Sequence, residues 1–141
     1  MNINSLTYLF TIFSTKFRDN FEKQMIEIGL HSGQVFILNS LWEINGQSQA
    51  KLVKNLNLSA PTIYNMVTKM SDSGFIEIKK DPNDARIMRV FLTSKGRDIK
   101  PLVHQNLDSF DESTFQVLTE TERMMLNILL QKLVISILPQ K

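Results

Sequence analysis

The residues from Phe75 to Thr93 are the one stretch of the chain in which the hydrophobic period drops to two. This period predicts two half-buried β-strands. Residues 81–84 between them read Asp-Pro-Asn-Asp and favour a turn, so the two strands are predicted to close into a β-hairpin. The apolar positions that share a face in each strand are Ile76 and Ile78 in the first and Met88, Val90 and Leu92 in the second.

Basic residues flank the tip of this hairpin and gather in the middle of the chain. Between Gln49 and Arg97 there are nine basic and four acidic residues, whereas the rest of the chain has seven basic and ten acidic ones. A basic hairpin in a helical chain suits the groove of a nucleic acid. A small solvated β-ribbon is the alternative interpretation. The basic residues nearest the tip are Lys79, Lys80, Arg86 and Arg89.

Hydrophobic residues three or four positions apart predict helices on both sides of the hairpin. The first and the last of these helices carry more apolar surface than one intrachain contact needs, so we expect them to form an interface between subunits. A ligand site is the other interpretation of the aromatic stripe on the first helix. The predicted helices, with their caps, run from about Asn4 to Ile28, Ser32 to Ile44, Ser48 to Leu56, Ser59 to Gly74, Ser94 to Phe115 and Glu120 to Leu138.

The third and fourth predicted helices are short and are joined by a tight turn at Asn57 and Leu58. The fourth helix leads through Gly74 directly into the basic hairpin, which is the arrangement of a winged helix-turn-helix. Its outward face has short side chains that can form hydrogen bonds, so base edges can approach closely, and its N-terminus suits a phosphate. An ordinary exposed polar face is the alternative. The residues of this face are Ser59, Ala60, Thr62, Tyr64, Asn65, Thr68 and Lys69.

The composition argues against several classes of protein. With 141 residues and 43% hydrophobic content, the chain can form one domain with a core. It has neither the roughly 18 uninterrupted apolar residues of a membrane span nor a secretory pattern, so we expect a soluble cytoplasmic protein. There is no cysteine, and His31 and His104 lie far apart, so we predict no metal site and no cofactor. No nucleophile–base pair or phosphate-cradling glycine loop has usable spacing, which argues against an enzyme.

The order of these elements resembles the MarR family of bacterial transcriptional regulators over nearly the whole chain. Residues 74–77 read Gly-Phe-Ile-Glu, residues 81–86 Asp-Pro-Asn-Asp-Ala-Arg, and residues 90–96 Val-Phe-Leu-Thr-Ser-Lys-Gly. This pattern is similar to the wing signature of the family, an Asp-x-Arg at the tip followed by Leu-Thr and a nearby Gly. Residues 30–34, Leu-His-Ser-Gly-Gln, resemble the entry of the family to its second helix.

The expected fold is mainly α with a small β-hairpin (α+β), a winged helix-turn-helix with N- and C-terminal dimerisation helices. We expect residues 1–141 to form a single MarR-like domain. Within it, residues 1–30 and 94–141 are expected to supply the dimerisation helices, and residues 31–93 the winged helix-turn-helix that binds DNA.

The resemblance also implies roles for individual residues. Arg86 corresponds in position to the minor-groove arginine of the wing, Asp84 to the acidic residue that orients it, and Lys69 to a usual phosphate contact. Ala85 and Asn65 stand where many members have arginine, which implies fewer guanine contacts. The DNA-binding residues implied in this way, together with Ala60 of the outward helix face and Lys79 of the basic hairpin, are Ser59, Ala60, Pro61, Thr62, Tyr64, Asn65, Lys69, Lys79, Asp84 and Arg86.

Members of the family often bind small aromatic or phenolic anions in a cleft between the DNA-binding and dimerisation parts. In this chain, the residues expected to line such an effector pocket are Phe13, Phe17, His31 and Phe36. Packing in a hydrophobic core is the alternative role for each of them.

The function expected from these observations is that of a homodimeric, sequence-specific regulator of transcription that binds double-stranded DNA. We expect a repressor that recognises a pseudo-palindromic operator and responds to a small-molecule effector. One alternative is a regulator of the same fold that senses no ligand, or that a protein partner controls. Another is a winged helix used to dock proteins, although the basic middle of the chain and the Asp84–Arg86 tip argue against it.

Overall fold

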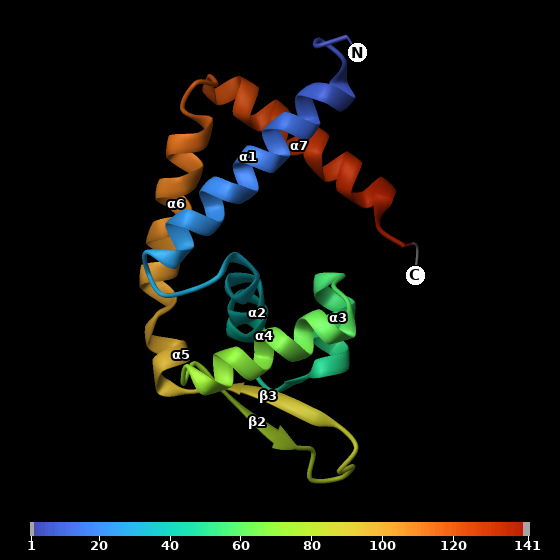
Figure 1. The fold of residues 1–141 in the computed structure, drawn as a ribbon, viewed down its shortest axis with the longest axis vertical. Helices are drawn as coiled ribbons and strands as arrows, with labels where there is room; N and C mark the ends of the chain where they lie inside the picture. The colour runs from blue at the N-terminus through green and yellow to red at the C-terminus, as the bar shows by residue number, and fades with distance from the viewer. Residues whose placement is uncertain (1, 140–141) are drawn as a thin grey trace. The chain divides into compact units, whose positions relative to one another are not determined.

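Residues 2–139, which this computed structural model describes, contain seven helices and three short strands (Figure 1). They belong to two compact units, one ending at Asn106 and the other beginning at Leu107. None of the described helices combines the length and the hydropathy that a membrane span requires. The elements in chain order are α1 (Leu6–Ile26), α2 (Ser32–Glu43), β1 (Gln47–Ser48), α3 (Gln49–Leu56), α4 (Ala60–Asp72), β2 (Ile76–Lys80), β3 (Met88–Leu92), α5 (Ser94–Asp98), α6 (Lys100–Phe115) and α7 (Glu120–Ile137).

The helix-turn-helix forms because α2, α3 and α4 bury their apolar faces against one another. The turn between α3 and α4 is tight because Asn57 adopts the left-handed backbone conformation, with φ of 54°, which asparagine tolerates better than most residues. Ser59 then begins α4 by accepting a hydrogen bond from the backbone N–H of Thr62. The side chains of these three helices that are at most 1% exposed include Leu38, Leu41, Leu52, Ile63 and Val67.

The strands form an antiparallel sheet in the order β1-β3-β2. The predicted hairpin is present as β2 and β3, with Ile76 opposite Leu92 and Ile78 opposite Val90. A third strand, β1, was not predicted; it pairs with the far edge of β3 and makes the sheet three-stranded. A strand of two residues shows no hydrophobic period, so no local pattern could have predicted it. The prediction of a mainly α fold with a small β-hairpin is otherwise confirmed.

The helix predicted from Ser94 to Phe115 is wrong as a single element, because it is divided into α5 and α6. Ile99 ends α5, with its backbone N–H 3.2 Å from the Lys95 carbonyl. Pro101 stands at the second position of α6 and has no N–H to donate to the carbonyl of Arg97, so the hydrogen-bond series of one helix cannot run into the next.

The second unit contains the C-terminal part of α6 and all of α7. Thr119 and Glu122 form a capping box: the Thr119 N–H lies 2.8 Å from the Glu122 carboxylate, and the Glu122 N–H lies 3.2 Å from the Thr119 hydroxyl. Arg123 joins α7 to α6 through an ion pair of 2.9 Å with Glu112. No residue of α7 is buried in the single chain, although Ile128 and Leu133 are large and apolar. This helix therefore presents an extensive apolar surface.

Candidate nucleic-acid interface

Helix α4 presents a polar surface opposite its buried face. Ile63, Val67 and Met70 are fully buried, and their spacing leaves Tyr64, Asn65 and Lys69 exposed on the outer side. At the N-terminal end the predicted residues Ser59, Ala60 and Pro61 are also exposed, and their short side chains leave the helix end open to a ligand. The predicted residues of this helix therefore form an accessible outer strip, in which Thr62 and Thr68 are half-buried and the others are exposed.

The hydroxyl groups of Ser59, Thr62 and Thr68 are already engaged with the protein. The Ser59 and Thr62 hydroxyl oxygens lie 2.7 Å apart, and the Thr68 hydroxyl donates to the Tyr64 carbonyl at 2.9 Å. Within residues 2–139, by contrast, no hydrogen bond uses the side chains of Asn65 and Lys69. These two side chains can bond to a ligand without first giving up an internal partner.

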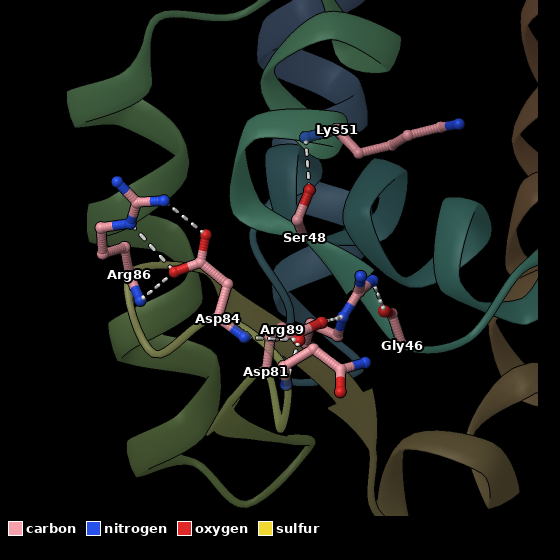
Figure 2. Close-up of polar contacts among 8 residues, drawn as sticks. Gly46, Ser48, Lys51, Asp81, Asp84, Arg86 and Arg89 are labelled. Atoms are coloured by element: carbon pink, nitrogen blue, oxygen red, sulfur yellow. Dashed lines mark hydrogen bonds and ion pairs between the residues drawn. The ribbon is translucent and has the colours of Figure 1, made fainter.

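The wing tip holds Arg86 in one orientation. The guanidinium Nε and Nη2 atoms donate to the two carboxylate oxygens of Asp84 at 3.0 and 2.9 Å, and the Arg86 backbone N–H donates to the same carboxylate at 3.0 Å (Figure 2). These hydrogen bonds, with the Arg86 side chain as the main donor, hold the pKa of the Asp84 carboxyl below its ordinary value. The Arg86 side chain is still 89% exposed. The tip thus offers a solvent-facing guanidinium whose direction is fixed by a two-pronged contact.

A second carboxylate, Asp81, organises the base of the wing tip. One of its oxygens accepts the backbone N–H groups of Asn83 and Asp84, at 2.8 and 3.1 Å. The other oxygen accepts the Nε–H of Arg89 at 2.5 Å, and this bond is the main reason why the pKa of the Asp81 carboxyl is lowered. From the sequence alone, Asp81 was predicted only as a turn residue and Arg89 only as a basic residue flanking the tip. The hairpin register contained the missing signal, because Lys79 pairs with Arg89 and Asp81 therefore lies diagonally across from Arg89.

Lys79, which was also predicted to bind DNA, is engaged on the hairpin itself. Its ammonium lies 3.1 Å from the Glu77 carboxylate and 5.6 Å from the centre of the Phe91 ring. Its side chain remains 61% exposed, so a weak surface ion pair of this kind leaves it accessible.

The wing tip and the recognition helix meet in a shared groove of about 390 Å³. This groove brings Arg86 together with Ala60, two of the residues that the sequence analysis assigned to DNA binding. The residues that line it are Ser48, Gln49, Ala50, Val53, Ala60, Ile63, Arg86, Ile87 and Met88.

The four residues predicted for an effector pocket separate into two environments. Phe13 and Phe17 lie 5.7 Å apart on α1, and Phe21 continues this series to Phe36, with centroid distances of 6.3 and 6.0 Å. His31 instead takes part in the entry to α2, where its Nδ1 atom lies 2.6 Å from a carboxylate oxygen of Glu22.

The Glu22 carboxylate also caps α2. Its other oxygen accepts the backbone N–H of Ser32 at 2.8 Å, and this bond is the largest of the effects that lower the pKa of the Glu22 carboxyl. The neighbouring His31 lowers it further. A ligand pocket shared by His31 and the aromatic series stays a prediction.

Known proteins share both the sequence pattern and the fold. The model of the MarR family matches residues 30–88. The HTH-type transcriptional regulator BilQ of Clostridium symbiosum (strain WAL-14163) is 27% identical over 128 residues, which cover 88% of this chain and 89% of BilQ. The HTH-type transcriptional regulator YybA of Bacillus subtilis (strain 168) is 26% identical over 106 residues, 75% of this chain and 71% of YybA.

Solved structures superpose on this chain. A MarR transcriptional regulator from Methanosarcina mazei Go1 superposes with a TM-score of 0.80 at 24% identity, covering 94% of this chain and 98% of that one. A mutant MarR from E. coli complexed with operator DNA gives a TM-score of 0.82 at 23% identity, with coverage of 93% and 94%. These structures share the fold.

The fold and the matches define the class: the chain is a winged helix-turn-helix regulator of transcription that binds DNA. Over residues 30–88 it is similar to the MarR family, as its wing signature predicts. Members of this family are regulators without enzymatic activity, which confirms the prediction that the chain is not an enzyme. The predicted roles of single residues and the predicted division into DNA-binding and dimerisation parts stay predictions.

Proposed function

We propose that this protein represses transcription by binding a pseudo-palindromic operator as a homodimer, with α4 in the major groove and the wing in the adjacent minor groove. The observation that carries the proposal is the Arg86 guanidinium, which is fixed by Asp84 and exposed at the tip of a hairpin beside α4. In a winged helix-turn-helix, these two elements are the ones that approach DNA.

The outer strip of α4 supports contact with base edges. Asn65 is exposed and makes no internal hydrogen bond within the described residues, so its amide can form the two-bond contact with adenine N6 and N7. Lys69, one turn later, carries an ammonium that suits a phosphate. The hydroxyls of Ser59 and Thr62 are bonded to each other, and we therefore assign them mainly to capping the helix.

The wing supports contact with a narrow minor groove. An A·T-rich minor groove is narrow and has an enhanced negative potential, which attracts an inserted arginine. Because Asp84 already restricts the Arg86 side chain, less rotamer freedom is lost when DNA binds. The proposed preference is therefore for A·T pairs beside each half-site.

The homodimer is supported by the apolar surfaces at the two ends of the chain. On α1, Leu6 is 85% exposed and Phe10 is 57% exposed, and α7 has no buried residue at all. Surfaces of this kind are stable in water only when another surface covers them. A two-fold dimer would also place two recognition helices about one helical turn apart on DNA.

Repression is the simplest regulatory outcome, since a dimer that occupies a promoter needs no further contact to block it. For release, we propose a small aromatic or phenolic effector that binds beside the phenylalanine series of α1 and Phe36, because neighbouring aromatic rings can pack against an aromatic ligand. The operator complex would then dissociate when such a compound is added. A cytoplasmic location is part of the same proposal, because the DNA of a bacterial cell lies there.

The test compares Arg86→Ala with the wild type on one labelled operator at several salt concentrations. We expect weaker binding, a salt slope that is lower by roughly one unit per lost phosphate-equivalent contact, and loss of the preference for A·T flanks. Arg86→Lys is the matched control, because it keeps the positive charge but lacks the fork that Asp84 holds. It should retain most of the salt slope and lose the flank preference. If Arg86→Ala bound with unchanged affinity and unchanged flank preference, the wing would not contact DNA.

A further inference from the structure

The carboxylate of Asp81 makes more contacts than a turn requires. Its Oδ1 atom accepts the two N–H groups that shape the turn, from Asn83 and Asp84. Its Oδ2 atom points the other way and accepts from Arg89 on β3. Asp81 is only 9% exposed, so this second contact is shielded from water. The first pair of bonds explains the turn, and the contact with Arg89 calls for a separate explanation.

Arg89 extends the contact to the helix-turn-helix. Its Nη1 atom donates to the backbone carbonyl of Gly46 at 3.0 Å, in the loop that precedes β1 (Figure 2). Gly46 is itself constrained, because its φ of 77° suits glycine and an added Cβ atom would lie 2.8 Å from the Phe91 ring. Two residues later, Ser48 caps α3 by accepting the Lys51 N–H at 3.1 Å.

These bonds form one connected path between the wing tip and the helices. Arg86 is held by Asp84, the backbone of Asp84 is held by Asp81, and Asp81 is joined through Arg89 to the loop that begins α3. A hairpin that is attached to the sheet only by its strands can bend relative to the helices. The path adds a second attachment near the tip, where bending moves Arg86 the most.

A phosphate contact is the other role open to Arg89, and the structure argues against it. The Arg89 side chain is 38% exposed, against 89% for Arg86. Both its Nε and one terminal nitrogen are committed to internal acceptors. A guanidinium whose charge is already matched by a shielded carboxylate has little left to offer a phosphate.

We propose that Asp81 and Arg89 are positioning residues that fix the direction of the wing, so that Arg86 enters the minor groove at a set number of base pairs from the bases contacted by α4. This inference rests on the proposed function, because it presumes that Arg86 touches DNA. It predicts that operator recognition depends on the spacing between the Arg86 contact and the α4 contact on DNA, and not only on the chemistry of each.

The substitution Asp81→Asn gives a test in which two explanations predict opposite signs. It removes a negative charge from the basic wing, so general electrostatics predicts equal or tighter binding to DNA. The asparagine amide can still accept the turn N–H groups through its oxygen, but it presents an NH₂ group to the Arg89 donors and breaks the path. Positioning therefore predicts weaker operator binding. Glu77→Gln is the matched control, because it removes the same charge from the same hairpin without touching the path.

The deciding measurement uses two operators that differ only in the place of the A·T flanks. One has the flanks at the preferred distance from the half-sites, and in the other they are displaced by one base pair. For the wild type and for Glu77→Gln, we expect displacement to weaken binding about tenfold, the size of one good contact. For Asp81→Asn and for Arg89→Gln, we expect the ratio of the two dissociation constants, displaced operator over preferred operator, to be near one. The ratio compares two DNAs with one protein sample, so partial unfolding of a variant cancels.

Arg86→Ala separates failure of this inference from failure of the proposed function. If Arg86→Ala kept the wild-type ratio, the wing contact itself would be absent and the proposed function would be at fault. Suppose instead that Arg86→Ala lowered the ratio to one, while Asp81→Asn and Arg89→Gln kept the wild-type ratio. The wing would then reach DNA without the path, and the inference alone would be overturned. Asp81→Asn combined with Arg86→Ala should bind no more weakly than Arg86→Ala, because the path acts only through Arg86.

Discussion

The proposed dimer can be tested on α7, where the single chain leaves large apolar side chains in water. Leu129 is 48% exposed and Leu133 is 56% exposed. If this surface faced solvent in the functional protein, replacing either residue with aspartate would change stability by no more than about 0.5 kcal/mol. If the surface is an interface between subunits, the same substitution places a carboxylate between two apolar surfaces. The two cases therefore predict very different free-energy changes for the same substitution.

The expected magnitude follows from the exposed half of each side chain. Covering half of a leucine contributes roughly 1 kcal/mol, and burying an unpaired polar group costs at least roughly 2 kcal/mol. A two-fold dimer carries every substitution twice. Leu133→Asp should therefore weaken association by about 6 kcal/mol, which raises the dimer Kd by about four orders of magnitude.

Light scattering after size exclusion, at micromolar protein concentration, measures the effect directly. The wild type should have the mass of two chains, and Leu133→Asp the mass of one chain or of an unfolded species, which circular dichroism distinguishes. Gln131→Asp is the control, because it introduces the same charge on the same exposed helix about half a turn away from the leucine row. A wild-type mass of one chain would refute the reasoning, and so would a Leu133→Asp protein that kept the wild-type Kd.

Two further predictions concern α4 and the cap of α2. Asn65→Ala should relax the preference at one base pair in each half-site by about 1–3 kcal/mol, whereas Lys69→Ala should weaken all sequences alike; selection of binding sites from random DNA checks both. The pKa of Glu22 is lowered in the folded state, so its contribution to stability is present above its ordinary pKa of 4.5 and is lost as the pH falls through the lower folded value. Thermal melts should therefore show Glu22→Gln less stable than the wild type at neutral pH, with the difference vanishing in acid.

The parts of this fold that a local pattern specifies could be predicted from the sequence. The alternation of residues 76–80 and 88–92 predicted the hairpin, and the starts expected at Ser59 and Glu120 agree with those of α4 and α7 within about a residue. The contact between Asp84 and Arg86 could also be predicted, because only Ala85 separates them in sequence. In each case, the information lies in neighbours along the chain.

Features that depend on distant neighbours could not be predicted in this way. The strand β1 exists because residues 47–48 find the free edge of β3, some forty residues later. The bond from Arg89 to Gly46 spans 43 residues and depends on the register of the whole sheet. The separation of α5 from α6 was missed for a different reason: a proline near a helix start is well tolerated, so Pro101 did not by itself reveal that a new helix begins there.

Asp81 and Asp84 are three residues apart and both bind an arginine. The two ion pairs differ in exposure, and they therefore differ in their effect on stability. The Asp84–Arg86 pair is at the surface, where an ion pair contributes little to stability. Its proposed value is to reduce the rotamer freedom that Arg86 would otherwise lose on DNA. Asp81 is shielded, so leaving it or Arg89 without its partner carries a desolvation penalty that an exposed pair avoids. The shielded pair can therefore resist bending of the wing, while the exposed pair orients Arg86 and still leaves its guanidinium accessible to the groove of DNA.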